Sequence, residues 1–89
     1  MPAAQLLVWR CIAITPRKWE LSPLGELGGG FWVVAIFGAS VIWYNDIEDG
    51  YNVSTYPTLG EIGAYGADQY ELEHVLQQLI NRATASVVQ

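Results

Sequence analysis

The residues from 31 to 56 constrain the fold more than any other part of the chain. Phe31–Phe37 is a run of seven apolar residues, rich in aromatic and β-branched types, which follows three consecutive glycines. A run this short, bounded by glycine, is typical of a strand that is covered on both faces. Residues 41–47 and 51–56 follow, and both alternate in character along the chain as a strand does.

Two short turns separate these expected strands, at residues 38–40 and 48–50. The second ends in Asp49-Gly50, which is a strong hairpin signal because glycine adopts a positive φ without steric cost. Pro57 has no N–H to donate and ends the third strand. The sequence therefore predicts an antiparallel meander over residues 31–56, and the apolar face of such a meander needs a cover.

The N-terminal segment is expected to add a further strand. Residues 5–15 are apolar except for Gln5, Arg10 and Thr15, and we expect Pro16 to end the strand. This strand would lie at an edge of the sheet or beside residues 31–37. The connection over residues 16–30 is too long for a hairpin turn. We expect four of its apolar residues to anchor it to the core: Trp19, Leu21, Leu24 and Leu27.

One amphipathic helix is predicted near the C-terminus. Asp68 is a good N-cap, and Glu71 three residues later completes a pair that resembles a capping box. Apolar residues then recur at helical spacing and form one stripe: Leu72, Val75, Leu76, Leu79, Ile80 and Ala83. We expect this stripe to cover one face of the sheet.

Together these elements predict a single small domain over residues 1–89, with frayed ends at residues 1–4 and 84–89. The expected fold class is α+β. It has two layers, a mostly antiparallel sheet of about four strands and one C-terminal helix packed on a face.

Charge is divided unevenly along the chain. Residues 1–18 hold three basic residues and no acid, whereas residues 19–89 hold all nine acids and one base, a net charge of −8. Such a body repels nucleic acid and attracts a basic protein. Net negative charge also keeps a small apolar domain soluble without any partner, so both interpretations stay open.

Few residues are suited to catalysis or metal binding. Cys11 is the one cysteine and His74 the one histidine, and no catalytic motif surrounds either. A single cysteine excludes an internal disulfide and a thiolate cage for a metal. Counted from Asp46 as a calcium loop, the sixth position is Tyr51 where glycine is required. We therefore predict no catalytic site, no metal and no cofactor.

The same sequence predicts a cytoplasmic protein that does not enter a membrane. The longest nearly continuous apolar run, residues 31–44, is too short to cross a bilayer as a helix. No secretory signal is visible at the start of the chain.

The densest polar cluster is the turn region 45–52, and aromatic residues flank it. We single out six residues as candidate partner contacts: Trp43, Tyr44, Asp46, Glu48, Asp49 and Tyr51. The alternative is a solvated hairpin tip, since turns favour Asp, Asn and Gly, with aromatics that serve the core. Aromatics on a face that the helix leaves open would meet the N-terminal segment, another subunit or a partner.

Three functions follow from these features. The leading hypothesis is a small acidic protein-binding module, of inhibitor or immunity type, that covers a basic surface of a target. The alternative is a homo-oligomeric structural domain that uses the aromatic sheet face or an open strand edge. A small enzyme ranks last, because only Cys11 or the acids are available to it.

Overall fold

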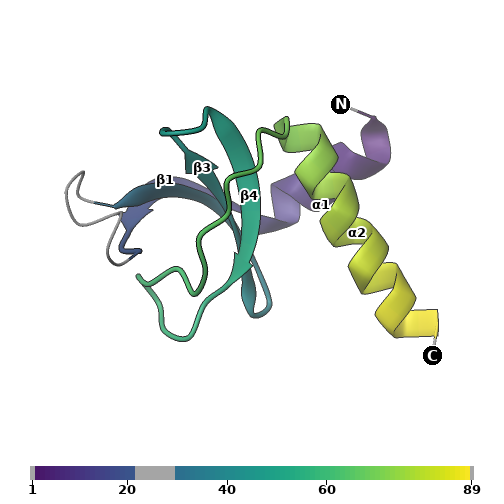
Figure 1. Ribbon diagram of the computed structural model, residues 1–89. Coiled ribbons are helices and arrows are strands. Elements are labelled where there is room, and N and C mark those ends of the chain that lie inside the picture. The colour runs from purple at the N-terminus through teal and green to yellow at the C-terminus, as the bar shows by residue number, and fades with distance from the viewer. Residues whose placement is uncertain (1, 22–29, 89) are drawn as a thin grey trace.

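The computed structural model contains four antiparallel strands and two helices (Figure 1). It describes the backbone of residues 2–21 and 30–88, and the burial of side chains up to residue 82. Their order along the chain is α1 (Ala3–Ile12), β1 (Ala13–Trp19), β2 (Phe31–Phe37), β3 (Ser40–Asn45), β4 (Gly50–Thr55) and α2 (Leu72–Val88). The strands lie in the sheet in the order β1-β2-β3-β4. The expected α+β fold, with its sheet of four strands and C-terminal helix, is confirmed.

The meander is the part of the fold that the sequence predicted most closely. β3 pairs with β4 without interruption, from Ser40 opposite Thr55 to Asn45 opposite Gly50. The role expected of Gly50 is wrong, because Asp49 is the residue in the left-handed region, with φ 55°. A Cβ on Gly50 would lie 2.3 Å from the Cα of Gln69, so the glycine allows another segment to approach closely.

The strand expected over residues 5–15 is wrong for most of its length, since residues 5–12 belong to α1. Its inward side is formed by Gln5, Val8, Trp9 and Ile12, which have helical spacing. Leu6 and Leu7 are exposed on the other side. A polar residue inside and leucines outside conceal the helical period, so the apolar pattern alone could not reveal it.

The fourth strand is instead β1, which pairs with β2 at the edge of the sheet as expected. β1 continues through Pro16, which was predicted to end it. The register shifts between Ala13 and Arg17, and an irregular edge strand tolerates a residue without an N–H. Trp19 and Leu21 are buried as expected. Leu24, Leu27 and two of the three glycines lie outside the described residues.

Helix α2 begins at Leu72, so the expected cap at Asp68 is wrong. The carbonyl oxygen of Glu71 accepts hydrogen bonds from the backbone N–H groups of His74 (3.1 Å) and Val75 (3.2 Å). Glu71 is therefore the N-cap residue of α2. The helix includes residues 84–88, for which fraying stays a prediction. Met1 and Gln89, at the two expected frayed ends, lie outside the described residues.

Two apolar clusters lie on opposite faces of the sheet. On the helix face, Val75, Leu76 and Leu79 of α2 pack with Ile12, Ala35 and Ile42, which confirms the predicted cover. Leu72 and Ile80 of the stripe pack against the same cluster, and the side chain of Ala83 lies outside the described part of the chain. The opposite face is covered by residues 56–71, which connect β4 to α2. We call this connection the strap and the face that it covers the strap face. In Figure 1 the strap passes in front of the sheet while both helices lie to one side of it.

Candidate functional site

The strap is fastened to the sheet by side chains that bond its backbone. Ser54 Oγ donates to the carbonyl oxygen of Ala64 (2.7 Å), and Asn45 Nδ2 donates to that of Gly66 (2.8 Å). Asn52 forms two bonds with the backbone of Asp68, one donated and one accepted, both 3.1 Å. An irregular segment leaves its backbone groups without regular partners, so these bonds fix its path.

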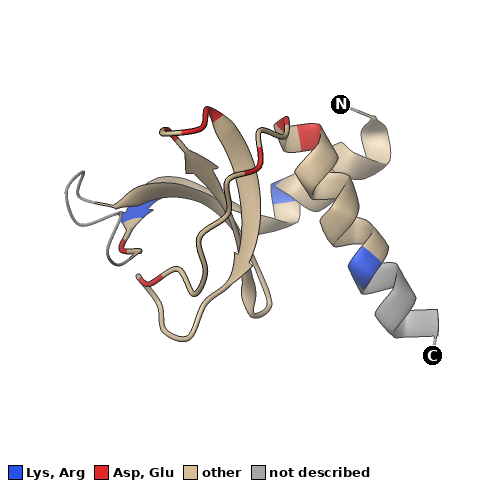
Figure 2. Ribbon diagram, in the orientation of Figure 1, with Lys and Arg blue, Asp and Glu red and all other residues tan. Residues whose placement is uncertain are grey.

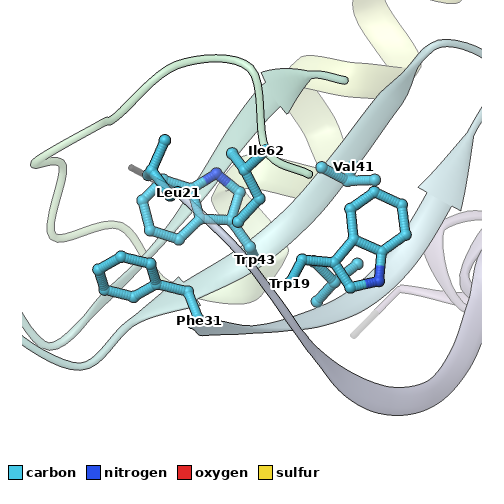
Figure 3. Close-up of a cluster of buried hydrophobic side chains, with 7 residues drawn as sticks. Trp19, Leu21, Phe31, Val41, Trp43 and Ile62 are labelled. Atoms are coloured by element: carbon cyan, nitrogen blue, oxygen red, sulfur yellow. The ribbon is translucent and has the colours of Figure 1, made fainter. Parts of the chain in front are cut away.

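Trp43 lies under the strap and does not reach the surface, so its assignment as a partner contact is corrected. Its side chain is 0% exposed, and its Nε1 donates to Ser54 Oγ (3.0 Å). The ring centroid is 5.0 Å from that of Phe31. Figure 3 shows the Trp43 ring among Leu21, Phe31 and Ile62. Residues alternate between faces along β3, and Trp43 points to the strap face.

A row of aromatic residues crosses the opposite face, perpendicular to the strands. Trp32 lies opposite Tyr44, Tyr44 opposite Tyr51, and Tyr51 forms a bridge with Tyr70 of the strap. Residues directly opposite each other in antiparallel strands share a face. We call Trp32, Tyr44, Tyr51 and Tyr70 the aromatic row. The register that aligns them depends on two strand pairings, β2 with β3 and β3 with β4, and on the bridge to the strap.

Ring contacts support this alignment. The centroids of Tyr44 and Tyr51 lie 5.2 Å apart with the planes at 61°. Tyr70 stacks on His74 of α2, at 4.3 Å and 25°. At the other end of the row, Lys18 is opposite Trp32, and its Nζ lies 5.4 Å from the Trp32 ring.

The aromatic row is the part of the helix face that the helices leave uncovered. Trp32 is 44% exposed and Tyr70 38%, whereas Tyr44 and Tyr51 are half-buried. Tyr51 also packs against the cluster beneath α2, which ties the row to the core. Exposed aromatic rings on a packed base are the kind of surface that contributes most to protein binding.

Acidic residues gather at the tyrosine end of the row. Asp46 and Asp49 are exposed in the turn between β3 and β4, and Glu48 is half-buried there. The strap brings a second acidic segment, residues 68–73, beside β4. Figure 2 shows both acidic segments at the same end of the molecule. They contain six of the nine acids: Asp46, Glu48, Asp49, Asp68, Glu71 and Glu73.

The acidic turn is directly connected to the row. The hydroxyl of Tyr44 donates a hydrogen bond to Asp49 Oδ1. This bond raises the pKa of Tyr44 above 10.0, and desolvation and the nearby charges of Asp49, Tyr51 and Asp46 add to the effect. The five exposed or half-buried residues among the six predicted contacts therefore belong to one patch: Tyr44, Asp46, Glu48, Asp49 and Tyr51.

Asn45 orders the turn that carries these acids, and sequence reasoning missed it. Its Oδ1 accepts from the backbone N–H groups of Ile47 (3.0 Å) and Glu48 (3.2 Å), while its side chain is 0% exposed. Asn just before a turn is a known local signal for such bonds. Trp32, Tyr70 and His74 were not among the predicted contacts, because only the tertiary pairing brings them to the row.

The residues considered for catalysis or metal binding lie elsewhere or apart. Cys11 is exposed on α1, and His74 contacts Tyr70 and shares a hydrogen bond with Gln78 (3.2 Å). Among the described residues, no three His, Cys, Asp or Glu side chains are placed to hold a metal ion together. Neither helix, within that part of the chain, is long and apolar enough to cross a membrane.

A shallow groove lies between β1 and the strap, and Lys18 is the residue it shares with the surroundings of the aromatic row. Its volume is about 730 Å³, and none of the predicted contact residues lines it. Its lining comprises Ile14, Thr15, Arg17, Lys18, Trp19, Ile36, Leu59 and Gly60.

Comparison of the chain with protein-family models, curated proteins and solved structures finds no match. The geometry of the aromatic row and its acids is therefore the basis for a functional proposal.

Proposed function

We propose that this chain is a non-catalytic protein-binding module that covers a basic surface of a target, as an inhibitor or immunity-type protein does. The observation that carries the proposal is the meeting of two acidic segments, distant in sequence, beside one row of aromatic rings. The strap that joins them is bonded to the sheet at several points. A prearranged surface loses less entropy when a partner binds.

The charge arrangement supports a basic protein in preference to other partners. Six carboxylates beside the row attract lysine and arginine, and they speed the encounter with a basic surface. Phosphates would be repelled by the same groups. Tyrosine rings supply contact area at a low entropic cost, and their hydroxyls add hydrogen bonds. The acids thus favour the encounter and the rings favour the bound state.

The proposal is tested by a pull-down from the native cell with two charge-matched variants. One carries Asp46→Asn and Asp49→Asn beside the row. The other carries Glu20→Gln and Glu61→Gln, exposed acids outside both acidic segments that form a bridge with each other just after β1. We expect the wild type and the second variant to retain a basic protein, which added salt releases. The first variant should no longer retain it. Equal retention by both variants would refute the proposed surface.

A homo-oligomeric domain is the second candidate, and α1 favours it. Leu7 is 63% exposed and Leu6 37%, so the outer side of this helix presents apolar area. The open edge of β1 is less suitable than α1 as an interface between subunits. Pro16 lacks an N–H, and the adjacent basic residues Arg17 and Lys18 disfavour pairing with a second strand. Sedimentation at high concentration, repeated with Leu7→Glu, separates this candidate from a monomeric binder.

The proposed location is the cytoplasm. The exposed thiol of Cys11 supports it, because a reducing compartment keeps such a thiol free of disulfides. In intact cells, Cys11 should react with a membrane-permeable maleimide and not with an impermeable one. Labelling by the impermeable reagent would contradict this location.

A further inference from the structure

We infer that the aromatic row receives an extended proline-rich segment with basic residues at one end, lying across the strands. This inference rests on the proposed function and names the part of the partner that binds. It starts from the direction of the row, which runs from Trp32 on β2 through Tyr44 and Tyr51 to Tyr70 on the strap. A ligand that touches all four rings must therefore run perpendicular to the strands.

The dimensions of the row suit a polyproline helix. Neighbouring strands lie about 4.8 Å apart, so a row across four neighbouring segments is about 14 Å long. A polyproline helix rises about 3.1 Å per residue, so four or five residues, roughly, would span it. The Tyr44 and Tyr51 rings meet edge to face, not stacked, which leaves an angular surface where a flat proline ring can rest.

The hydrogen-bonding groups of the row also suit this ligand. A polyproline helix has no internal hydrogen bonds, and its carbonyl oxygens point outward as acceptors. The row presents the indole N–H of Trp32 and the hydroxyls of Tyr51 and Tyr70 as donors, whereas the Tyr44 hydroxyl already donates to Asp49. Recognition of proline-rich segments by aromatic surfaces uses this combination of ring contact and donated bonds.

Addition of a partner strand to the sheet is the less suitable mode. At the β4 edge, the N–H of Tyr51 already donates to the carbonyl oxygen of Tyr70 (2.9 Å), and that of Gly63 donates to Thr55 (2.8 Å). At the β1 edge, Pro16 and the shifted register interrupt the pattern of bonds that an added strand needs. The ligand therefore lies on the face and not along an edge.

Charge sets the direction of the ligand. Asp46 and Asp49 lie at the tyrosine end, where Tyr44 bonds Asp49, whereas Lys18 lies over Trp32 at the other end. The basic residues of the segment should therefore lie at the Tyr70 end, where residues 68–73 add further acids, and the prolines should extend over Tyr51 and Tyr44 toward Trp32. Bases of single-stranded DNA could stack on the same rings, but the acids repel the phosphates.

The test measures fluorescence anisotropy with short labelled peptides and the full chain. The first peptide has two arginines followed by Pro-Pro-Leu repeats, the second replaces each proline by alanine, and the third replaces each arginine by glutamate. We expect the first peptide to bind about tenfold more tightly than either of the others, as expected when a few groups carry most of the affinity. Unlabelled oligothymidylate and cellohexaose, added as competitors, should not displace it.

The outcomes separate the inference from the proposed function. Equal, salt-sensitive binding of the proline and alanine peptides would overturn the inference and leave a basic partner in place. Absence of binding by both basic peptides would overturn the inference, and the pull-down above would then decide on the proposed function by itself. Displacement by oligothymidylate or cellohexaose would overturn the inference in favour of a nucleic acid or a sugar chain.

Variants at exposed rings locate the binding. Trp32→Ala and Tyr70→Ala should each weaken the first peptide about tenfold. Phe37→Ala is the matched control, because Phe37 is 39% exposed on the same strand as Trp32 but lies opposite Ser40, outside the row. An equal loss with Phe37→Ala would overturn the placement on the row. Circular dichroism of each variant verifies that the fold is intact.

Discussion

The strap face and the helix face of the sheet are closed by different kinds of contact. On the strap face, buried polar side chains bond an irregular segment, and Gly66 approaches so closely that a Cβ would lie 2.5 Å from Asn52 Oδ1. On the helix face, aliphatic side chains of α2 pack against Ala35 and Ile42. An irregular segment needs partners for its backbone, whereas a helix satisfies most of its own and needs only apolar contact.

This difference explains why the aromatic row is open. The strap follows the sheet closely and leaves Trp43 with no exposed area. The helices are rigid rods, and they cover the sheet only where their apolar stripe meets it. Trp32 and Tyr70 therefore stay exposed on the helix face although they resemble core residues in type.

Replacement of the buried tryptophan should be the most damaging change. We expect Trp43→Ala to lower the free energy of unfolding by about 3–5 kcal/mol, because it leaves a cavity and Ser54 loses a donor. Such a loss is a large part of the stability of a small domain. Trp32→Ala, at 44% exposure, should cost about 1 kcal/mol or less. Urea unfolding of both variants gives the two values, and equal losses would break the comparison.

The helix face should respond to loss of apolar volume alone. Leu76 is 0% exposed, and Leu76→Ala should lower the free energy of unfolding by about 3 kcal/mol. Leu7→Ala on α1 is the control, since Leu7 is 63% exposed and its loss should cost about 0.5 kcal/mol or less. Thermal unfolding by circular dichroism measures both. A small effect of Leu76→Ala would mean that α2 is not held by burial.

The strap face should respond to loss of one polar side chain. Asn45→Ala should cost about 2 kcal/mol, because the carbonyl of Gly66 and the N–H groups of Ile47 and Glu48 lose their partner. Asn81→Ala is the control, since Asn81 is exposed and accepts a hydrogen bond from Gln77 on the helix surface. Its loss should cost a few tenths of a kcal/mol. Equal effects would show that the polar bonds do not fasten the strap.

The smallest effect concerns the acidic end of the row. The pKa of Tyr44 is raised, first by its hydrogen bond to Asp49, so the contact is complete below pH 10.0 and is lost as pH rises through the raised value. Asp49→Asn should bring this pKa back toward its ordinary value. Tyrosinate absorbance of the wild type and the variant, followed against pH, measures the shift. An unchanged titration would show that the bond is absent in solution.

Several features followed from local sequence alone. The meander was predictable because residues 31–56 alternate in character and turn residues separate the strands. The stripe of α2 was predictable because its apolar residues have helical spacing. Glu48 and Asp49 were expected in a turn, which places them at the end of a hairpin, and Asp46, expected at the end of the strand, lies in the same turn. Each of these depends on periods and residue types within a few neighbours.

The tertiary structure decided the features that make the candidate site. Residues 5–12 are apolar on nearly all sides, so their pattern does not reveal a helix. Contact with α2, where Gln5 Nε2 donates to Gln77 Oε1 (2.7 Å), stabilises them as one. Trp43 and Tyr44 are neighbours of similar type, and only the cover over each face decided that one is buried and the other lies on the surface. The alignment of Tyr70 with Tyr51 required the strap. A local pattern sets the shape of a segment, but long-range packing determines which side of it remains in contact with water.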